Sequence, residues 1–323
     1  MHITDWKSTA WLRALGQKSS SIVDDIEFRP NKVISKNLIG NWDPNNLACY
    51  DGDVGGTSYD NLVDGGENLC LVNMDTSPKS TDFSPPVTTR PSYPAYFNGD
   101  GSDNYMANCY GDEYSSDNFE IDADEDFTLS VWVDPAKVNA HGTWEEVFIG
   151  VGPVNDNTDG GLGVGIIESA SDGAWATIAS FIPDIDLGGY GSYTGRRAVV
   201  GEEGYIRRNK WYQLSLVKQS YNAAFDRVTL YLNGVYQRVP AGSYAGTDHH
   251  GEMVPAGYIG GDQQLYVMGM WQTYGGGGAI GPAASLGTSF GHILVYQKAL
   301  THSELRQNYL AQKGVYYKFR EGL

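Results

Sequence analysis

Basic residues are scarce in this chain of 323 residues. It carries 22 lysines and arginines against 39 aspartates and glutamates, which gives a formal net charge of -17. Nucleic acids and anionic membrane surfaces are themselves negatively charged, so this balance argues against both as partners. The acidity favours solubility and permits the binding of cations.

Long apolar runs and cysteines are also few. No segment approaches the roughly 20 apolar residues that span a bilayer, so we expect no membrane partner. The 3 cysteines are an odd number, so any disulfide framework leaves one thiol over. The first residues, MHITDWKSTAWLRALGQ, lack the apolar centre of a secretory signal. Together these features predict synthesis in a reducing cytoplasm. The cysteines are Cys49, Cys70 and Cys109.

Glycine and aromatic residues are abundant, a composition typical of short strands joined by turns. The clearest local signal is Asn233-Gly234, which joins the alternating segments VTLYL and VYQRV. Asn-Gly suits a type I′ turn because both residues tolerate positive φ, so we expect a β-hairpin. Further predicted strands are AYFNG, NYMANCY, FTLSVWV, EVFIGVG, LGVGIIES, WATIASFI, GYIRR, WYQLSLVK, YIGG, LYVMGMW and GHILVYQ.

One helix is predicted, near the C-terminal end. Thr301 stands at the N-cap position and Glu304 follows three residues later, which is the pattern of a capping box. Gly314 is placed to end this helix as a C′ glycine.

Residues 1–40 differ in composition from the rest. A short amphipathic helix ended by Gly16 precedes a serine run and a proline, so this region reads either as an extended docking arm or as a first strand on the sandwich. We divide the chain into this arm, 1–40, and one β-rich body, 41–323. The residues that we expect to dock the arm on a partner surface are Trp6, Trp11, Leu12 and Leu15.

Several motifs of the body, taken together, resemble a known family. The segments are 41–73 (with Tyr59, Asp60, Asn61, Leu62 and Gly65), YFNGDGSDNYM, FTLSVWV and GHILVYQKALTHSELRQNYLAQKGVY. Each is similar to a segment of the laminin-G-like, concanavalin A-like domains found in bacteriophage virion structural proteins. The resemblance covers residues 41–317.

The resemblance implies an all-β fold, a jelly-roll sandwich of two antiparallel sheets. It also implies a non-enzymatic virion protein, made in the host cytoplasm and displayed on the virion surface. We expect a capsid decoration or cement protein because the chain has no repetitive shaft. Its partners would be the major capsid protein or tail components, with a homotrimer as the analogous assembly. The alternatives are a tail fibre or a free carbohydrate-binding module, because this fold serves many functions.

Acidic residues suggest two further sites. Glu120 and Glu125, in an E-x-D-x-x-E spacing, resemble the paired carboxylates of a jelly-roll glucanase family, and glycan hydrolysis is the weakest alternative. Carboxylates are also the ligands that calcium prefers, so Ca²⁺ is a candidate cofactor, although none is required. The candidate calcium ligands are Asp100, Asp103, Asp122 and Asp124.

Two other motifs were considered as zinc-binding and glycan-binding sites. His249 and His250 are adjacent and have no third ligand at a suitable spacing, so we expect a polar turn rather than zinc. Aromatic residues in glycine-rich segments offer an apolar face and a polar tip to a sugar or a protein. We predict that they form a recognition rim for cell-surface glycans: Tyr190, Tyr193, Tyr244, Trp271 and Tyr274.

Overall fold

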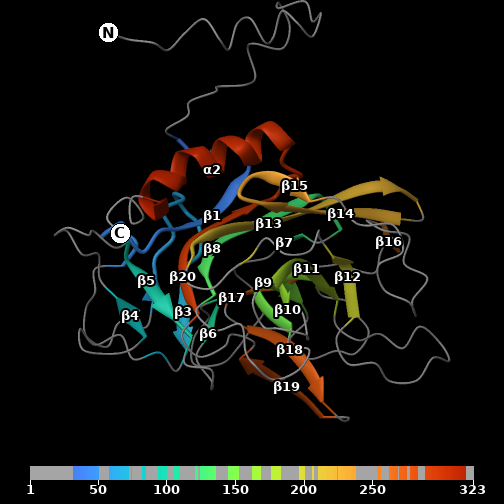
Figure 1. Ribbon diagram of the computed structural model, residues 1–323, viewed down its shortest axis with the longest axis horizontal. Coiled ribbons are helices and arrows are strands. Elements are labelled where there is room, and N and C mark those ends of the chain that lie inside the picture. The colour runs from blue at the N-terminus through green and yellow to red at the C-terminus, as the bar shows by residue number, and fades with distance from the viewer. Residues whose placement is uncertain are drawn as a thin grey trace, which may run out of the picture.

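The chain forms two antiparallel β-sheets that stack face to face, with helix α2 (His302–Tyr317) lying across the outer side of one of them (Figure 1). This is the predicted all-β sandwich. The computed structural model describes residues 32–50, 58–72, 74, 82–84, 94–99, 105–108, 121–122, 124–135, 145–152, 162–168, 176–182, 196–200, 206, 210–223, 225–237, 253–255, 262–267, 269–274, 277–282 and 288–317.

The sheet beneath α2, which we call sheet I, follows the order β15-β14-β13-β8-β20-β5-β4, with β1 added to β20 and β16 added to β14. Its β20 comes from the end of the chain and lies between strands from the first half. The bounds are β1 Leu38–Trp42, β4 Phe83–Ser84, β5 Tyr96–Asn98, β8 Phe127–Asp134, β13 Tyr212–Asn222, β14 Phe225–Leu232, β15 Val235–Gln237, β16 Met253–Pro255 and β20 Ser289–Tyr296.

Sheet II follows the order β12-β11-β10-β9-β17-β6-β3-β2, with β7 added to β17. A separate hairpin consists of β18 and β19. The bounds are β2 Ser58–Tyr59, β3 Leu69–Val72, β6 Tyr105–Asn108, β7 Ile121–Asp122, β9 Glu145–Gly152, β10 Leu162–Glu168, β11 Ala176–Ile182, β12 Arg196–Val200, β17 Asp262–Val267, β18 Gly269–Tyr274 and β19 Gly277–Pro282.

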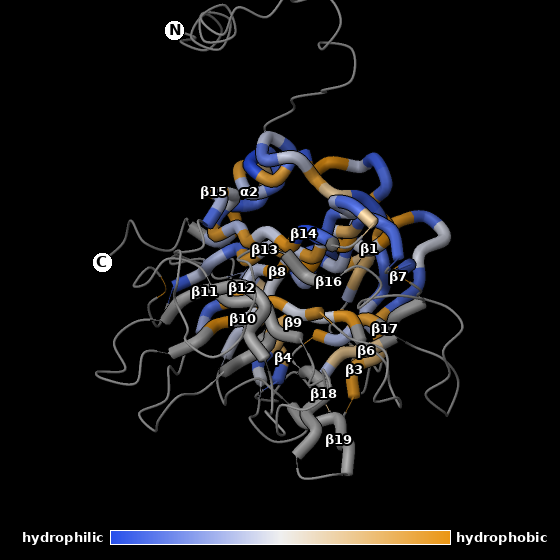
Figure 2. The backbone as a smooth tube through the Cα atoms, turned by 90° about the vertical axis from the view of Figure 1, so that its right-hand side faces the viewer, coloured by the Kyte–Doolittle hydropathy of each residue, from blue (hydrophilic) through white to orange (hydrophobic). Residues whose placement is uncertain are grey.

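The main core fills the space between the sheets. Successive side chains of a strand point to opposite faces, so β13 sends Leu214 and Leu216 inward, where they meet Leu129 of β8 and residues of sheet II such as Ile149. Full burial of one such side chain stabilises the fold by about 1.5–3 kcal/mol. Figure 2 shows hydrophobic positions along β9, β13 and β17, at the centre of the two layers.

Most predicted strands are confirmed, YIGG lies outside the described residues, and two segments differ from expectation. LYVMGMW divides between β17 of sheet II and β18 of the separate hairpin. Within the acidic segment 120–125, Ile121 and Asp122 form a strand, β7, because Ile121 is fully buried in the core and its strand pairs with β17. Of GYIRR, Ile206 alone lies among the described residues.

The end of the predicted arm belongs to the sandwich. Leu38–Trp42 forms β1 and pairs with β20. Just before it, the Ile34 amide donates to Asn308 Oδ1 of α2 at 2.8 Å, and the Tyr296 hydroxyl donates to the Ile34 carbonyl at 2.9 Å. Residues 1–31, with Trp6, Trp11, Leu12 and Leu15, lie outside the described residues.

The two described cysteines differ in their oxidation state. Cys70 is disulfide-bonded, whereas Cys49 is a free, buried thiol. The Cys49 Sγ donates to the Asp60 carbonyl at 2.6 Å and accepts from the Asp43 amide at 3.2 Å. Burial raises the pKa of this thiol to about 12, so Cys49 is an unreactive structural residue.

Helix α2 begins as predicted but ends later. The Thr301 amide donates to Glu304 Oε2 at 2.7 Å, and the Glu304 amide donates to Thr301 Oγ1 at 3.3 Å, which confirms the capping box. The prediction that Gly314 ends the helix is wrong, because α2 continues to Tyr317. The burial of Tyr316 against Trp132 keeps this last turn helical.

The Asn233-Gly234 hairpin is confirmed, since these residues have φ values of 56° and 67°. The turn lies directly against α2. A Cβ atom built on Gly234 would come within 2.9 Å of Tyr309 Cβ and 3.1 Å of Arg306 Cα. Arg306 also donates to the Asn233 carbonyl at 3.1 Å. Glycine is therefore required here both for its conformation and for its small size.

We predict that Gly234→Ala destabilises the protein far more than Gly65→Ala. Both glycines have positive φ, but no described atom lies within 4 Å of a Cβ on Gly65. Each alanine costs about 1–2 kcal/mol for the left-handed conformation, and the contact with α2 adds about 1–3 kcal/mol at Gly234. Urea denaturation measures both variants. Equal losses of unfolding free energy would show that the hairpin does not support the helix.

Candidate functional site

The outer face of sheet I carries polar and aromatic side chains. The register sets Gln219 of β13 opposite Arg227 of β14, and Val217 opposite Thr229. Tyr231 of β14 then lies opposite Tyr236 of β15. Because side chains alternate along strands, the members of this set that lie on β13 and β14 share one face.

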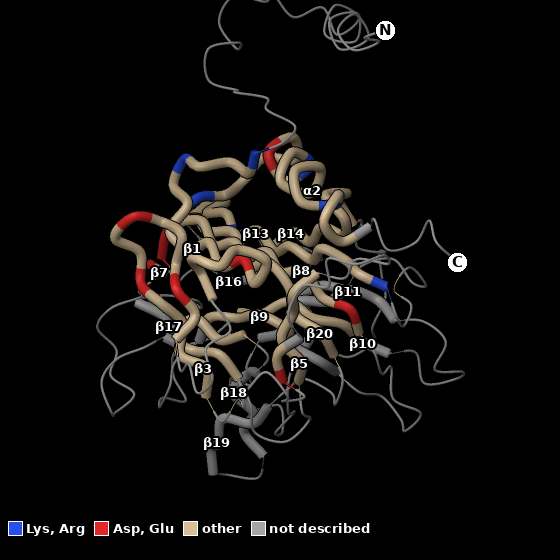
Figure 3. The backbone as a smooth tube through the Cα atoms, turned by 90° about the vertical axis from the view of Figure 1, so that its left-hand side faces the viewer, with Lys and Arg blue, Asp and Glu red and all other residues tan. Residues whose placement is uncertain are grey.

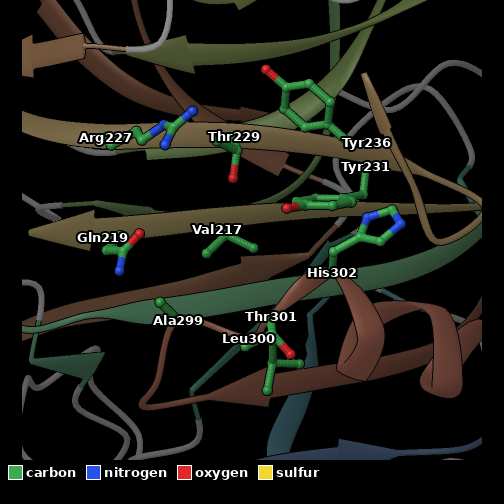
Figure 4. A pocket seen from close by; sticks show the side chains of 10 residues that line it. All are labelled: Val217, Gln219, Arg227, Thr229, Tyr231, Tyr236, Ala299, Leu300, Thr301 and His302. Carbon is green, nitrogen blue, oxygen red and sulfur yellow. The ribbon is translucent and has the colours of Figure 1, made fainter. Parts of the chain in front are cut away.

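Helix α2 covers only part of this face. Beneath it lies a small second core of Val217, Tyr231, Leu294, Tyr296, Leu300 and Leu305. The helix begins at His302, next to the part of the sheet that carries Gln219 and Arg227. A groove of about 460 Å³ opens there, a volume within the usual range for ligand sites. Its lining is Val217, Gln219, Arg227, Thr229, Tyr231, Tyr236, Ala299, Leu300, Thr301 and His302 (Figure 4).

The groove has two chemically different ends. Figure 4 shows the rings of Tyr231, Tyr236 and His302 at one end, and Arg227 with Gln219 at the other. The Tyr231 ring centroid is 5.8 Å from that of Tyr236 and 5.8 Å from that of His302. Tyr231 follows Arg227 by four positions on one strand, or about 13 Å at 3.3 Å per residue.

This arrangement is suited to binding. The rings offer apolar faces, while the guanidinium, amide and hydroxyl groups of Arg227, Gln219 and Thr229 offer hydrogen bonds along the same surface. The hydroxyl of Thr301 is engaged in the capping box at 2.9 Å from Glu304 Oε2. Among the described residues that line the groove, there are no paired carboxylates.

The aromatic recognition residues predicted from sequence stay a prediction, because most of them are not described. Tyr190, Tyr193 and Tyr244 lie outside the described residues, as do His249 and His250. Trp271 and Tyr274 lie on β18, paired with Ile280 and Gly277 of β19, and thus in a hairpin instead of a loop. The sequence did hold a signal for the groove, namely the alternation of Val217 with Gln219 and of Arg227, Thr229 and Tyr231.

The acidic segment after β7 is held by a buried cation. The Lys218 ammonium donates to the carbonyls of Asp124 and Glu125 at 3.0 and 3.1 Å, and it lies 3.4 Å from Asp226 Oδ2. Asp122 Oδ1 accepts from the Asp124 amide at 3.1 Å. Figure 3 shows acidic positions in the loops beside β7. The Lys218 side chain thus satisfies the turn's carbonyls.

Only some residues of the predicted calcium and hydrolase sites lie among the described residues. Asp122, Asp124 and Glu125 surround the turn held by Lys218, whereas Asp100, Asp103 and Glu120 lie outside the described residues. Within the described residues, no group of three or more His, Cys, Asp or Glu side chains could hold a metal ion. Glu125 is exposed.

A second hollow, of about 340 Å³, lies at the other end of α2 beside Asp43, His292, Gln312 and Tyr316. Its polar groups satisfy one another. Gln312 Nε2 lies 2.8 Å from His292 Nδ1, and its Oε1 accepts from Trp132 Nε1 at 2.6 Å and Gln213 Nε2 at 2.8 Å. Since Gln312 thereby donates to Nδ1, the neutral His292 carries its proton on Nε2, which lies 2.6 Å from Asn41 Oδ1. This hollow is a structural junction.

Comparisons with known proteins do not assign the chain to a family. No family model and no curated protein sequence matches it. Solved structures with some similarity include a Trypanosoma rangeli sialidase in complex with sialic acid, at 15% identity and a TM-score of 0.46, covering 88% of this chain and 34% of that one. The chain therefore spans about a third of the sialidase.

Two bacterial toxin domains are similar to the same extent. The receptor binding domain of botulinum neurotoxin C/D mosaic serotype has 12% identity and a TM-score of 0.47, with 86% of this chain and 52% of that chain covered. The binding domain of Paraclostridial Mosquitocidal Protein 1 has 12% identity and a TM-score of 0.46, with 85% and 52% covered. The chain spans about half of each. The fold description rests on the sheets and core described above.

The described residues contain no helix that is long and apolar enough to cross a membrane.

The His292 junction predicts a loss of stability in mild acid. Burial lowers the pKa of His292 below its usual 6.5, while Asp43, 3.9 Å away, opposes this shift. Below pH 6.5 the unfolded chain gains a proton that the folded chain still resists, so the free energy of unfolding falls by up to about 1.4 kcal/mol per pH unit.

Urea denaturation between pH 7.5 and 5 checks this expectation. His292→Gln should give a shallower dependence on pH than the natural chain. If His292→Gln and the natural chain show the same change of unfolding free energy with pH, His292 does not contribute to the loss of stability in acid.

Calcium stays a prediction of the sequence. If Asp122 and Asp124 help to hold the ion, a chelator should lower the melting temperature, because a ligand that binds the folded state stabilises it. Thermal melts with and without EDTA measure this, and an unchanged midpoint contradicts calcium binding.

Proposed function

We propose that this protein is a non-enzymatic, glycan-binding β-sandwich displayed on the surface of a bacteriophage virion. The observation that carries the glycan-binding part is the groove beside the start of α2, where aromatic rings and hydrogen-bonding side chains line one continuous surface. Ligand sites usually combine an apolar surface with a few placed polar groups in this way.

The chemistry of the groove fits a sugar. A pyranose ring presents C–H groups on its faces and hydroxyls around its edge. Tyr236 is 37% exposed and offers its ring to such a face, while Gln219 and Thr229 face hydroxyls farther along the groove. Tyrosine provides contact area at little cost in conformational entropy.

Strands support the groove for most of its length. Gln219, Arg227, Thr229 and Tyr231 project from β13 and β14, which pair over eight residue positions. A site on paired strands is largely formed before the ligand arrives, so binding requires little ordering of side chains or backbone. Compared with a loop-borne rim, this favours recognition of a defined glycan.

The virion part of the proposal is supported by the sequence motifs. The closing segment, 291–316, resembles that of phage laminin-G-like modules, and it forms β20, the capped start of α2 and the wall of the groove. We propose a capsid decoration made in the host cytoplasm, which binds the major capsid protein and assembles as a homotrimer.

Analysis of purified particles tests the virion role. Mass spectrometry of virions after density-gradient purification should detect this chain in stoichiometric amounts, and limited proteolysis should cleave it before the major capsid protein. A chain abundant in the infected cell but absent from the particles would contradict the proposal.

We predict that Tyr236→Ala weakens glycan binding about threefold to tenfold, in line with about 0.5–1.5 kcal/mol for an aromatic contact. Tyr221→Ala is the matched control, because Tyr221 is 58% exposed on β13 but does not line the groove. A glycan array finds the ligand, and isothermal titration compares the two variants. Equal affinities would place the binding site elsewhere, and a folded protein that binds no glycan would contradict the proposed function.

A further inference from the structure

Two polar side chains are open to a ligand at the end of the groove away from the aromatic rings. Gln219 is exposed and Thr229 is half-buried, and neither side chain is hydrogen-bonded to another described residue. The Arg227 guanidinium beside them already has an interaction partner within the protein. A side-chain amide and a hydroxyl, both uncharged, are therefore the groups that meet a ligand at this end.

Gln219 and Thr229 are diagonal neighbours on paired strands. The register sets Val217 of β13 opposite Thr229 of β14, and Gln219 follows Val217 by two positions, on the same face. Diagonal neighbours on one face of an antiparallel pair lie about 7–8 Å apart. Figure 4 shows Val217 with Thr229 on one side and Ala299 on the other. The amide and the hydroxyl thus stand at the edge of a small apolar floor.

The apolar floor is rigid and small. Val217 and Leu300 are buried in the second core beneath α2, and Ala299 packs against that core. Only a limited apolar area therefore reaches the groove, enough for a methyl group. A charged group placed on this floor would lose its hydration without gaining an opposite charge, which is costly. The floor and its two uncharged neighbours instead suit a neutral group that combines a methyl with a hydrogen-bond donor and an acceptor.

We propose that the groove recognises glycans that contain an N-acetylated sugar, whose acetamido group takes the place of one hydroxyl. An acetamido group is a trans amide, so its N–H and its carbonyl point to opposite sides. Gln219 Nε2 donates to the carbonyl and Thr229 Oγ1 accepts from the N–H. The methyl group rests on Val217 and Ala299, and a neighbouring sugar contacts Tyr236. This inference rests on the proposed glycan-binding function and names its ligand class.

Matched neutral glycans on the glycan array test the inference with the full-length protein. Each acetamido glycan is printed beside the counterpart that carries a hydroxyl at the same carbon: triacetylchitotriose beside cellotriose, and N-acetyllactosamine beside lactose. We expect the acetamido members to bind about tenfold more tightly, because they add a hydrogen bond and a buried methyl group. The deacetylated chitosan trimer is cationic, and its binding at equal strength would show that attraction to a chain of net charge -17 suffices, which would overturn amide recognition.

Three variants complete the experiment, each checked for folding by its thermal melt. Gln219→Leu keeps the size of the side chain and loses the amide, so the preference for the acetamido member of a pair should fall from about tenfold to about twofold. Thr229→Val, which loses only the hydroxyl, should also lower the preference. Ser220→Ala removes a hydroxyl from the next, exposed position of β13, outside the groove, and should leave the preference unchanged.

The outcomes separate the two proposals. Equal binding within both pairs, or a Gln219→Leu variant that keeps the full preference, would overturn acetamido recognition and leave glycan binding intact. Binding of glycans without an acetamido group alone would do the same. If a folded protein bound no member of the array, both proposals would fail.

Discussion

The docking of α2 on a polar sheet face is the interaction on which the rest of this structure depends. Trp132 projects from β8 between the rings of Tyr309 and Tyr316, stacked at interplanar angles of 15° and 11°. Its Nε1 donates to Gln312, which in turn contacts His292 of β20. A buried polar group without a partner costs about 1–3 kcal/mol, so this network holds the helix in one position.

The same docking creates the groove. Because α2 begins at His302, its first turn forms a wall of the groove beside Val217 and Tyr231. The length of the helix and the position of its capping box thus decide how much of the sheet remains open. The Asn233-Gly234 hairpin also supports the groove, because its close contact with α2 helps to fix the helix that forms one wall of the groove.

Local features were predictable from the sequence, and features that join distant segments were not. The I′ turn at Asn233-Gly234 and the capping box of Thr301 and Glu304 depend on neighbouring residues, and both are confirmed. The helix runs past Gly314 because Tyr316 packs on Trp132, a residue from another strand. Tertiary packing overrode the local propensity of glycine in this case.

The candidate site likewise depends on contacts between distant segments, which the sequence did not predict. Sequence reasoning placed recognition in glycine-rich aromatic segments such as that of Trp271, because exposure was inferred from composition. The candidate groove combines β13, β14 and β15 with residues 299–302, segments so far apart in the sequence that no short motif predicts their contact. Likewise, Lys218 reads as a surface residue at the end of a strand, yet it is fully buried under the acidic turn.

The crystal structure of the protein bound to an oligosaccharide found on the glycan array tests the central claim most directly. We expect the sugar to lie over the outer face of sheet I, with one ring against Tyr236 and its hydroxyls near Gln219 and Thr229. A sugar bound away from β13 and β14, for example on the β18–β19 hairpin, would contradict the claim that the groove beside α2 is the recognition site.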